Sequence, residues 1–370
     1  MLRVLYIEPF DAGSHAEFTR AVTTGIEARW TVLSLPGRHW KWRMRGAAVH
    51  FSLSHADTLS KPYDVVLASA FLPLAELRGL VPALSTIPTV LYFHENQLAY
   101  PVQHEAADGR DHHYGFTQLV SALAADRCAF NSEYNRQSFL DAGRTLLQRM
   151  PDAVPQNWIE RLETRSVVTG YPLRLGASGE VTDDLPGEPR ALGPVLLWNH
   201  RWEHDKAPEV FFSALARLQA RGVPFRVAVA GERFRTSPAI FEQAHKSLGS
   251  RVVHWGYLPS REAYEALLRR SHLAVSTARQ EFFGVSTLEA VAHGARPLVP
   301  DRLAYRELYP AALRYQDDEL ASALEQLCRA WVRGEITLRE ERPTLIDPQE
   351  APRCLARLHT LLRDLADPPA

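Results

Sequence analysis

Cysteine is scarce in this sequence, with only Cys128, Cys328 and Cys354 among 370 residues. Their odd number and wide spacing exclude the disulfide framework of a small secreted domain, and they form no metal-binding pattern. Cysteines that are few and scattered in this way are typical of a protein from a reducing compartment. We therefore expect a cytoplasmic protein.

Long apolar runs and a net charge are also missing. No run is long enough to cross a bilayer, and residues 2–10 have the length of a strand and include Glu8, unlike a secretory signal. The 42 Lys and Arg residues nearly balance the 43 Asp and Glu residues, which leaves a formal net charge of −1. We expect no membrane partner, and any nucleic-acid contact has to come from a local patch.

The chain is too long for one ordinary core and suits two domains. Between residues 173 and 193 the composition shifts to Gly, Pro, Asp and Glu with little periodicity, which predicts a linker. We assign residues 1–172 to an N-terminal domain and 194–345 to a C-terminal domain. A helix within residues 346–370 is expected to pack back toward the N-terminal domain.

Short and nearly continuous apolar runs recur in both halves. Such runs are typical of strands that are buried on both faces of a parallel sheet, and most are followed by a loop and a helical pattern. They lie at residues 2–7, 30–35, 63–69, 89–93, 129–132, 194–198, 225–232, 251–257, 272–277 and 296–300. The fold class is therefore α/β, with two Rossmann-like domains whose parallel sheets face a cleft.

Residues 280–290 follow the apolar run 272–277 and turn into a helical pattern. Ser286 or Thr287 is the expected N-cap, which places Gly284 and Val285 in the turn. The turn at a helix N-terminus gathers backbone N–H donors and the positive end of the helix dipole, so it suits a negatively charged ligand.

Two carboxylates flank that turn, Glu281 before it and Glu289 inside the helix. A carboxylate only accepts hydrogen bonds, so both suit the hydroxyl groups of ribose and hexose. The pair would bracket a sugar nucleotide. The alternative is an ordinary strand–loop–helix with two solvated glutamates.

The loop after the predicted strand 194–198 carries Arg201 and Lys206 and leads into a helix that begins near Pro208. Two cations beside a helix N-terminus form a clamp for a diphosphate. In the alternative the loop is solvated, and its cations pair with Glu203 and Asp205.

Residues 37–45 interleave basic side chains with Trp40 and Trp42 directly after a predicted parallel strand. Ligands of open α/β sheets bind at that edge, aromatic faces stack on bases, and Lys41 and Arg43 could pair with phosphate. The alternative is a surface helix whose tryptophans pack inward while its cations are solvated.

His94 begins four consecutive polar residues, His-Glu-Asn-Gln, where the strand 89–93 ends. It could act as a general base or hydrogen-bond a sugar. His112 and His113 point to different faces of a helix and have no third ligand at helical spacing, so we predict no metal site there.

The spacing of Arg201, Lys206, Glu281 and Glu289 resembles the donor-binding motif of GT-B retaining glycosyltransferases, the large group that includes glycogen and sucrose synthases. The resemblance implies that the Arg and the Lys hold the donor diphosphate. It places the first Glu near the donor hexose and the second on the nucleotide ribose. Because two cations supply the charge, no divalent metal or other cofactor is expected.

Motifs of the N-terminal half look like the tRNA-queuosine α-mannosyltransferase family. They are Ile7-Glu8-Pro9-Phe10, Gly13-Ser14-His15, Trp40-Lys41-Trp42-Arg43, residues 92–101 and Phe130-Asn131-Ser132. The resemblance implies transfer of mannose from GDP-mannose to queuosine at the wobble position of an aspartate tRNA, with retention at the anomeric carbon. Ala12 stands where that family is expected to have the first glycine of a Gly-Gly-Ser-His loop.

The resemblance also implies the members of the site. The catalytic residues would be His94, Glu281, Arg201 and Lys206. The donor-binding residues would be Gly13, Ser14, Arg201, Lys206, Gly231, Tyr257, Glu281, Phe283, Gly284, Val285 and Glu289. The acceptor-binding residues would be His15, Trp40, Lys41, Trp42, Arg43, Glu95, Asn96 and Gln97. Two alternatives stay open: an enzyme of the same fold with another donor and a small-molecule or lipid acceptor, and a non-catalytic module that binds a nucleotide sugar or RNA.

Overall fold

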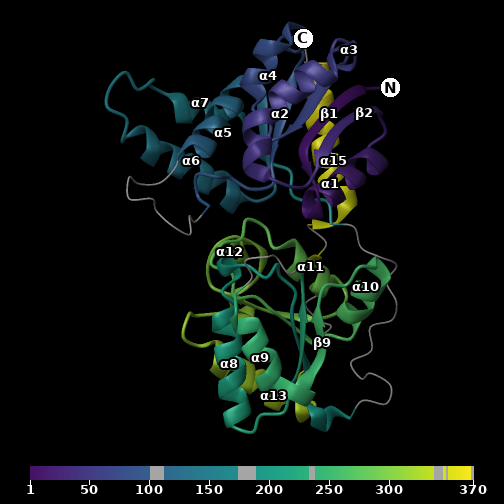
Figure 1. Cartoon of the computed structure of the whole chain (residues 1–370), viewed down its shortest axis with the longest axis vertical. Helices are drawn as coiled ribbons and strands as arrows, with labels where there is room; N and C mark the ends of the chain where they lie inside the picture. The colour runs from purple at the N-terminus through teal and green to yellow at the C-terminus, as the bar shows by residue number, and fades with distance from the viewer. Residues whose placement is uncertain (101–111, 174–188, 233–237, 337–344, 347–348, 368–370) are drawn as a thin grey trace. The chain divides into compact units, whose positions relative to one another are not determined.

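A computed structural model of the chain describes residues 1–100, 112–173, 189–232, 238–336, 345–346 and 349–367 (Figure 1). The chain divides into two compact units. The first comprises Met1–Arg174 with Gln349–Ala370, and the second comprises Leu175–Pro348. Most of the predicted linker, residues 174–188, lies outside the described residues.

The first unit is built on a parallel sheet. Its strands are β1 (Arg3–Asp11), β2 (Arg29–Pro36), β3 (Val65–Ser69), β4 (Thr89–Phe93), β5 (Arg127–Phe130) and β6 (Ser166–Val168). Its helices are α1 (Gly13–Gly25), α2 (Trp40–Ser54), α3 (Ala56–Leu59), α4 (Leu74–Leu80), α5 (His113–Ala124), α6 (Glu133–Leu147), α7 (Trp158–Arg165) and α15 (Ala351–Ala366). Within the described residues the strand order is β2-β1-β3-β4-β5-β6, so the winding reverses between β1 and β3.

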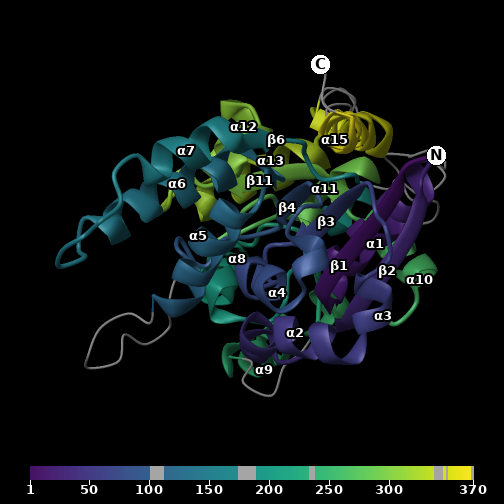
Figure 2. The same ribbon diagram turned by 90° about the horizontal axis from the view of Figure 1, so that it is seen from above.

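Both faces of this sheet are covered. Figure 2 shows α2 and α4 on one side of β1 and β3, and α15 on the other. Leu5 and Ile7 of β1 belong to the same core cluster as Phe51 of α2, while Val4 and Tyr6, which point the opposite way, are also fully buried. Burial on both faces is the reason that the strand is a nearly continuous apolar run.

The C-terminal helix α15 packs within the first unit. It lies beside α1 (Figure 1), and the two helices approach closely at Gly25, where a Cβ atom would lie 2.4 Å from Cδ1 of Leu355. The buried side of α15 carries Leu358 and Leu362. A backbone bridge between Leu173 and Glu350 joins the start of this segment to the same unit.

The second unit repeats the parallel α/β arrangement with a different strand order. Its strands are β7 (Val195–Trp198), β8 (Arg226–Ala230), β9 (Val252–Gly256), β10 (Leu273–Val275), β11 (Arg296–Pro300) and β12 (Arg314–Tyr315). Its helices are α8 (Pro208–Ala220), α9 (Ile240–Leu248), α10 (Arg261–Arg269), α11 (Val285–Ala292), α12 (Tyr305–Leu308) and α13 (Leu320–Val332). For the part of the unit that is described, the order is β12-β11-β10-β7-β8-β9, and the reversal lies between β7 and β10.

Helix α11 begins at Val285, which is two residues earlier than a cap at Ser286 predicts and three earlier than a cap at Thr287 predicts. Its cap residue is Gly284, not Ser286 or Thr287, and the backbone of Gly284 has a φ of 85°. Glycine adopts this left-handed conformation without the steric cost of a Cβ atom. The predicted serine cap was wrong: Ser286 is the second residue of the helix, and its hydroxyl faces His200 Nδ1 at 3.4 Å.

Replacement of Leu362 by alanine should loosen the first unit alone. Leu362 is fully buried in α15, and removing a buried leucine side chain costs about 2–5 kcal/mol. Hydrogen exchange followed by mass spectrometry should show faster exchange in β1, β3 and α1 and unchanged exchange in β7, β8 and β10. Leu80→Ala is the control, because Leu80 is 52% exposed. Equal loss of protection in both units would contradict the packing of α15 on the first.

Candidate functional site

In the second unit, two distant loops meet because the strands before them are neighbours. Strand β7 pairs with β10 through Leu196 and Leu273, so the loops that leave their carboxyl ends lie side by side. The Lys206 ammonium in the first loop donates to the Gln280 carbonyl at 2.8 Å and to Glu281 Oε2 at 3.3 Å in the second. The sheet reversal is where ligands of open α/β sheets bind.

Lys206 keeps its charge although its side chain is buried. Burial by itself lowers the pKa of Lys206, but Glu281 and Asp205 outweigh burial, and the pKa is raised. Burial acts on Glu281 in the opposite sense and is also outweighed, because Lys206 and His200 hold the pKa of this carboxyl below its ordinary value. The site therefore keeps a fixed ammonium–carboxylate pair through the neutral pH range.

The predicted clamp residues differ in their surroundings. The guanidinium of Arg201 is half exposed and lies 3.3 Å from Glu203 Oε2, and Lys206 Nζ lies 3.2 Å from Asp205 Oδ2. The ion pairs of the solvated-loop alternative therefore exist. That alternative nevertheless describes only Arg201, because Lys206 is buried and also contacts Glu281.

His200 belongs to this site, although the motif did not single it out. Burial lowers the pKa of His200 to about 4, so the imidazole is neutral. Its Nε2 and the Nε2 of Gln280 are buried and have no hydrogen-bond partner among the residues that the structure describes. Buried polar atoms without partners are costly and are commonly completed by a ligand or water.

Glu289 points from α11 toward α10. Its Oε1 accepts from Arg261 at 2.7 Å and its Oε2 accepts from the Tyr264 hydroxyl at 3.3 Å. The same hydroxyl accepts a hydrogen bond from Asn199 Nδ2 at 2.9 Å, which links Glu289 to the loop after β7. Arg261, Tyr264 and Asn199 hold a predicted site residue, yet nothing in the local sequence marks them.

The remaining predicted donor residues surround these loops in different ways. Gly231 directly follows β8, and a Cβ atom there would lie 1.9 Å from the carbonyl oxygen of His200, so only glycine lets the β7 loop pass. Phe283 is buried, whereas Tyr257 follows β9 and is 65% exposed. Val285 is the first residue of α11.

In the first unit, the candidate site includes the N-terminal residues of α1. Gly13 is its first residue and has a φ of 52°. The carbonyl oxygen of Ser14 accepts a hydrogen bond from the Tyr171 hydroxyl at 2.9 Å. His15 follows on the first turn and is buried.

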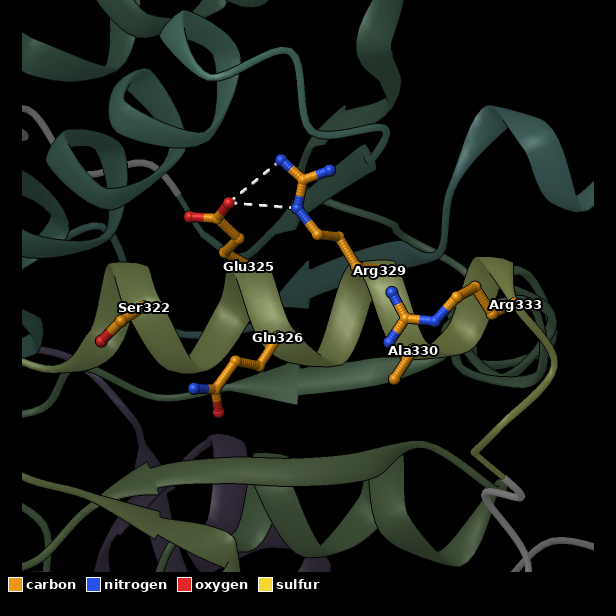
Figure 3. Close-up of a pocket in the computed structure, with 6 residues that line it drawn as sticks. All are labelled: Ser322, Glu325, Gln326, Arg329, Ala330 and Arg333. Carbon is orange, nitrogen blue, oxygen red and sulfur yellow. Dashed lines mark hydrogen bonds and ion pairs between the residues drawn. The ribbon is translucent and has the colours of Figure 1, made fainter.

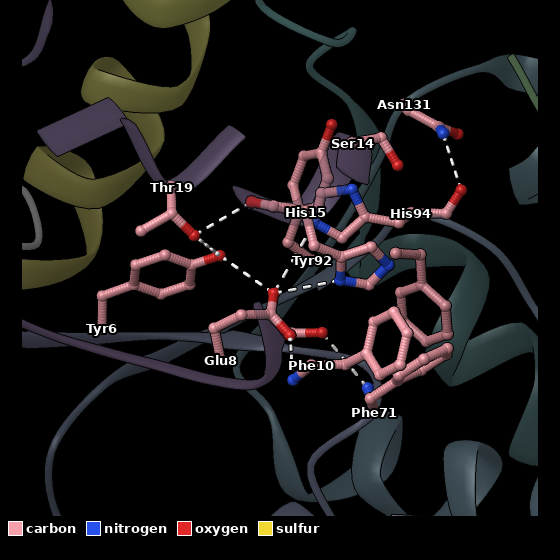
Figure 4. A network of polar contacts seen from close by, with 12 residues as sticks. Tyr6, Glu8, Phe10, Ser14, His15, Thr19, Phe71, Tyr92, His94 and Asn131 are labelled. Carbon is pink, nitrogen blue, oxygen red and sulfur yellow. Dashed lines mark hydrogen bonds and ion pairs between the residues drawn. The ribbon is translucent and has the colours of Figure 1, made fainter. Parts of the chain in front are cut away.

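His15 and His94 stack on each other beside Glu8 (Figure 4). The centroids of the two rings are 3.9 Å apart and the planes differ by 29°. Glu8 Oε2 lies 3.1 Å from His15 Nδ1 and 3.9 Å from His94 Nε2. Glu8 is absent from the predicted site, although the sequence marked it in two ways: as a charged residue inside an apolar strand and as part of the motif Ile7-Glu8-Pro9-Phe10.

Among the residues searched, one group has ligand atoms close enough together to hold a metal ion, within 4.8 Å of one another. It consists of Glu8, His15 and His94. The lone pair of an imidazole nitrogen lies in the plane of its ring. Two stacked rings with nearly parallel planes cannot both aim a lone pair at one ion close to them. The arrangement disfavours a shared metal, and the absence of a metal stays a prediction.

Asn96 uses its polar atoms inside the protein. It is fully buried, and its Nδ2 lies 2.9 Å from Asn135 Oδ1 and 3.0 Å from Ser138 Oγ. Its Oδ1 accepts from the backbone N–H of Ala99 at 2.8 Å. Asn96 therefore fixes the shape of the loop after β4, and we no longer include it among the direct acceptor contacts.

The neighbours of Asn96 are more accessible. Glu95 and Gln97 are half-buried, and Gln97 Nε2 donates to Glu95 Oε1 at 2.9 Å. The His94 carbonyl accepts from Asn131 Nδ2 at 2.7 Å, which fixes the backbone beneath the stacked imidazoles. Glu95 and Gln97 thus present polar groups on a rigid loop.

The basic and aromatic segment forms the start of α2, and its two tryptophans face different ways. Trp40 packs against Tyr114, with ring centroids 5.3 Å apart, and Trp42 is 65% exposed. Lys41 is exposed, while the Arg43 guanidinium donates to the Pro36 carbonyl at 3.2 Å. The inward-packing alternative is therefore correct for Trp40 only.

A hollow of about 430 Å³ lies elsewhere in the second unit (Figure 3). It is lined by side chains of α13 and the residue after it, and Arg329 pairs there with Glu325. None of the predicted site residues lines it. We do not regard this hollow as part of the site.

The two parallel sheets and the ligand loops at their reversals define the class of protein. Solved structures with the same fold include Anabaena HepE in complex with UDP, at 12% identity and a TM-score of 0.69, with 98% of this chain and 100% of that chain covered. A glycosyltransferase from Rickettsia africae covers 99% of each chain at 14% identity and a TM-score of 0.67. The fold is that of a GT-B glycosyltransferase, as predicted.

Residues 3–173 match the family model described as tRNA-queuosine alpha-mannosyltransferase N-terminal, and residues 193–329 match glycosyl transferases group 1. The tRNA-queuosine alpha-mannosyltransferase of Drosophila melanogaster is 38% identical over 336 residues, which cover 88% of this chain and 87% of that protein. A GDP-mannose:cellobiosyl-diphosphopolyprenol alpha-mannosyltransferase of Xanthomonas campestris is 26% identical over 36% of each chain. The chain belongs to the tRNA-queuosine α-mannosyltransferase family.

Each helix in the described part of the chain falls short of the length or the apolar character needed to cross a membrane. The three cysteines are all buried and free of disulfides.

Lys206→Met should destabilise the second unit more at pH 8 than at pH 5. The wild-type pair is intact at both pH values. The pKa of Glu281 is lowered, so its stabilising effect is lost only when the pH falls below the ordinary pKa of a glutamate. The pKa of Lys206 is raised, so its stabilising effect is lost only in strong base. The variant leaves the Glu281 carboxylate, whose side chain is 18% exposed, without the Lys206 ammonium, at a cost of about 3–5 kcal/mol. The pKa of Glu281 then rises, so protonation at pH 5 removes part of that cost.

Protection factors of β7 and β10 amides at the two pH values measure this effect. Lys246→Met, at an exposed position of α9, is the control and should change neither value. An equal loss of amide protection at pH 5 and pH 8 would show that the charge of Lys206 does not stabilise the loops.

Proposed function

We propose that this glycosyltransferase moves mannose from GDP-mannose to queuosine at the wobble position of an aspartate tRNA, with retention at the anomeric carbon. The observation that carries the proposal is the buried contact between Lys206 and Glu281 at the sheet reversal of a member of this family. The donor is further supported by the partial relative from Xanthomonas campestris, whose name specifies GDP-mannose.

Arg201 and Lys206 bind the diphosphate in this proposal. Negative charge grows on the leaving diphosphate as the glycosidic bond breaks, so fixed cations stabilise the transition state more than the ground state. Lys206 is preorganised by its three oxygen partners. Arg201 is half exposed and can exchange Glu203 for a phosphate oxygen. These two charges are the reason that we propose no metal.

The carboxylates then recognise hydroxyl groups. Glu281 lies near the hexose and Glu289 binds the ribose, with Arg261 and Tyr264 keeping Glu289 in position. Gly284 and Val285 place the N-terminus of α11 at the phosphates, where backbone N–H groups add to the positive potential. Gly231, Tyr257 and Phe283 complete the nucleotide side of the proposed donor site.

The acceptor is assigned to the first unit. Lys41 and Trp42 offer an exposed cation next to an exposed indole on α2, the combination that binds phosphate and stacks on a base. Glu95 and Gln97 lie after β4 and can bind acceptor hydroxyls, and His94 touches donor or acceptor hydroxyls. A balanced net charge makes such a local patch necessary. An acceptor of this kind also implies work in the cytoplasm.

Incubation with GDP-mannose and queuosine-containing tRNA should give a hexose mass gain on the modified nucleoside. Arg201→Gln should reduce the turnover number by about 100- to 1,000-fold, the usual effect of removing one donor to a developing charge. Arg221→Gln is the matched control, since Arg221 is a similarly exposed arginine paired with Glu325. Nucleoside mass spectrometry measures both.

Transfer to a lipid or small sugar without transfer to correctly modified tRNA would rule out the proposed acceptor. A thermal-shift comparison of GDP-, UDP- and ADP-sugars tests the donor separately, because a ligand that binds the folded state raises the melting midpoint. A larger shift with UDP- or ADP-sugars would rule out GDP-mannose.

Lys41→Ala should weaken tRNA binding and lower the slope of log affinity against log salt by about 1, because one phosphate contact is lost. Trp42→Ala should weaken binding without changing that slope. Leu53→Ala is the control for loss of an exposed apolar group on the same helix, since Leu53 is 79% exposed. GDP-mannose affinity should be unchanged in all three, and a fall would place α2 in the donor site.

A further inference from the structure

We propose that Glu8 is a positioning residue for this reaction: its buried carboxylate keeps the proton on His15 and so leaves His94 uncharged, with Nε2 available to a substrate hydroxyl. The inference rests on the proposed function for the identity of that hydroxyl. Its structural part concerns only the first unit.

Glu8 is fully buried, and within the described residues three groups lie within hydrogen-bond distance of its carboxylate (Figure 4). The Phe10 backbone N–H donates to Oε1 at 2.9 Å, and the Tyr6 hydroxyl donates to Oε2 at 3.1 Å. His15 Nδ1 also lies 3.1 Å from Oε2. An ionised carboxylate can only accept, so His15 must carry a proton on Nδ1.

Only one of the two stacked imidazoles can hold an extra proton. At a centroid distance of 3.9 Å two imidazolium rings would repel each other inside the protein. His15 is within hydrogen-bond distance of Glu8, whereas the 3.9 Å between His94 Nε2 and Oε2 exceeds it. The proton therefore stays with His15.

The surrounding groups also favour a proton on His15 and not on His94. Burial lowers the pKa of His15, but Glu8, Glu95 and Asp11 outweigh burial and raise it. Burial and the neighbouring His15 hold the pKa of His94 well below its ordinary value. Burial raises the pKa of Tyr6 well above the ordinary value, so this group remains a neutral donor to Glu8.

The other rings around His94 add no compensating charge. Tyr92 and Tyr171 lie at centroid distances of 4.7 and 6.4 Å, and burial raises the pKa of Tyr92 well above its ordinary value. Phe18 meets the His94 ring edge-on at 4.9 Å. The groups around this imidazole thus leave it neutral.

His94 Nε2 is the polar atom that this arrangement leaves unused. It is buried and has no hydrogen-bond partner within the described ranges. The Asn131 bond to the His94 carbonyl fixes the backbone, and the charged His15 ring fixes the plane of the imidazole. A hydroxyl group of the sugar or the acceptor would supply the hydrogen bond that Nε2 lacks.

Glu8→Gln tests the proposal, because glutamine has the same shape without the charge. Imidazole 15N NMR at pH 7, assigned with a His15→Gln variant, should show His15 doubly protonated in the wild type and neutral in Glu8→Gln. The turnover number should fall about 10- to 100-fold, the effect known for losing a carboxylate that orients a metal-ligating histidine, with less than a threefold change in KM for the donor. Glu8→Asp should keep His15 protonated and restore part of the turnover.

The His15→Gln variant gives a second test, in which His94 is expected to bind a proton more readily than in the wild type. Glu8 then has His94 as its nearest remaining base, so the pKa of His94 should rise, which an NMR titration measures. Glu17→Gln is the control, since Glu17 lies exposed on α1 and pairs with Arg20. A His15 that stays protonated in Glu8→Gln, a His94 whose pKa does not rise, or full turnover in Glu8→Gln would each overturn the proposal. Failure of the proposed acceptor would instead appear as no turnover in the wild type, with the NMR results unchanged.

Discussion

Both sheets reverse the direction of their winding at a single pair of strands, β1 with β3 in the first unit and β7 with β10 in the second. The strands are parallel, so all their carboxyl ends reach the same edge, and the loops at the reversal begin next to each other. A crevice outside those ends is where open α/β sheets bind ligands. The polar clusters of both units start from these two strand pairs, and the candidate site depends on strand order before it depends on any side chain.

Each reversal holds a charge that folding removes from water, Glu8 in the first unit and Lys206 in the second. Removing an ion from water costs several kcal/mol, and the attraction of partners offsets this cost only where their geometry is good. Lys206 has two carboxylates and a carbonyl oxygen, and Glu8 has three donors. Burial, together with the neighbouring charges of His15 and Lys206, keeps His94 and His200 neutral, and the Nε2 of each has no hydrogen-bond partner in the described part of the chain.

The local sequence pattern predicted the helices and strands well. It predicted poorly where individual side chains point. A polar run after a strand looks the same whether its side chains reach a ligand or a neighbouring helix, and Asn96 proves to be bound to α6 through Asn135 and Ser138. Trp40 and Trp42 lie two positions apart on a helix, which turns their side chains to different faces. The interpretation that both pack inward is therefore correct for Trp40 only, and contact of Trp42 with the acceptor stays a prediction.

The sequence by itself determined the fold class, the family and the elements that carry the motifs, because burial on both faces of a strand and the residues required at turns are local properties. Only the tertiary structure decided which distant groups meet. Lys206 and Glu281 are 75 positions apart in the chain, and Glu8 comes within reach of His94 only through the order of β1, β3 and β4. Strand order arises from packing over the whole unit, and no local pattern encodes it. That is why the contacts of Glu8, His200, Arg261 and Tyr264 with the predicted site residues became visible only in the folded chain.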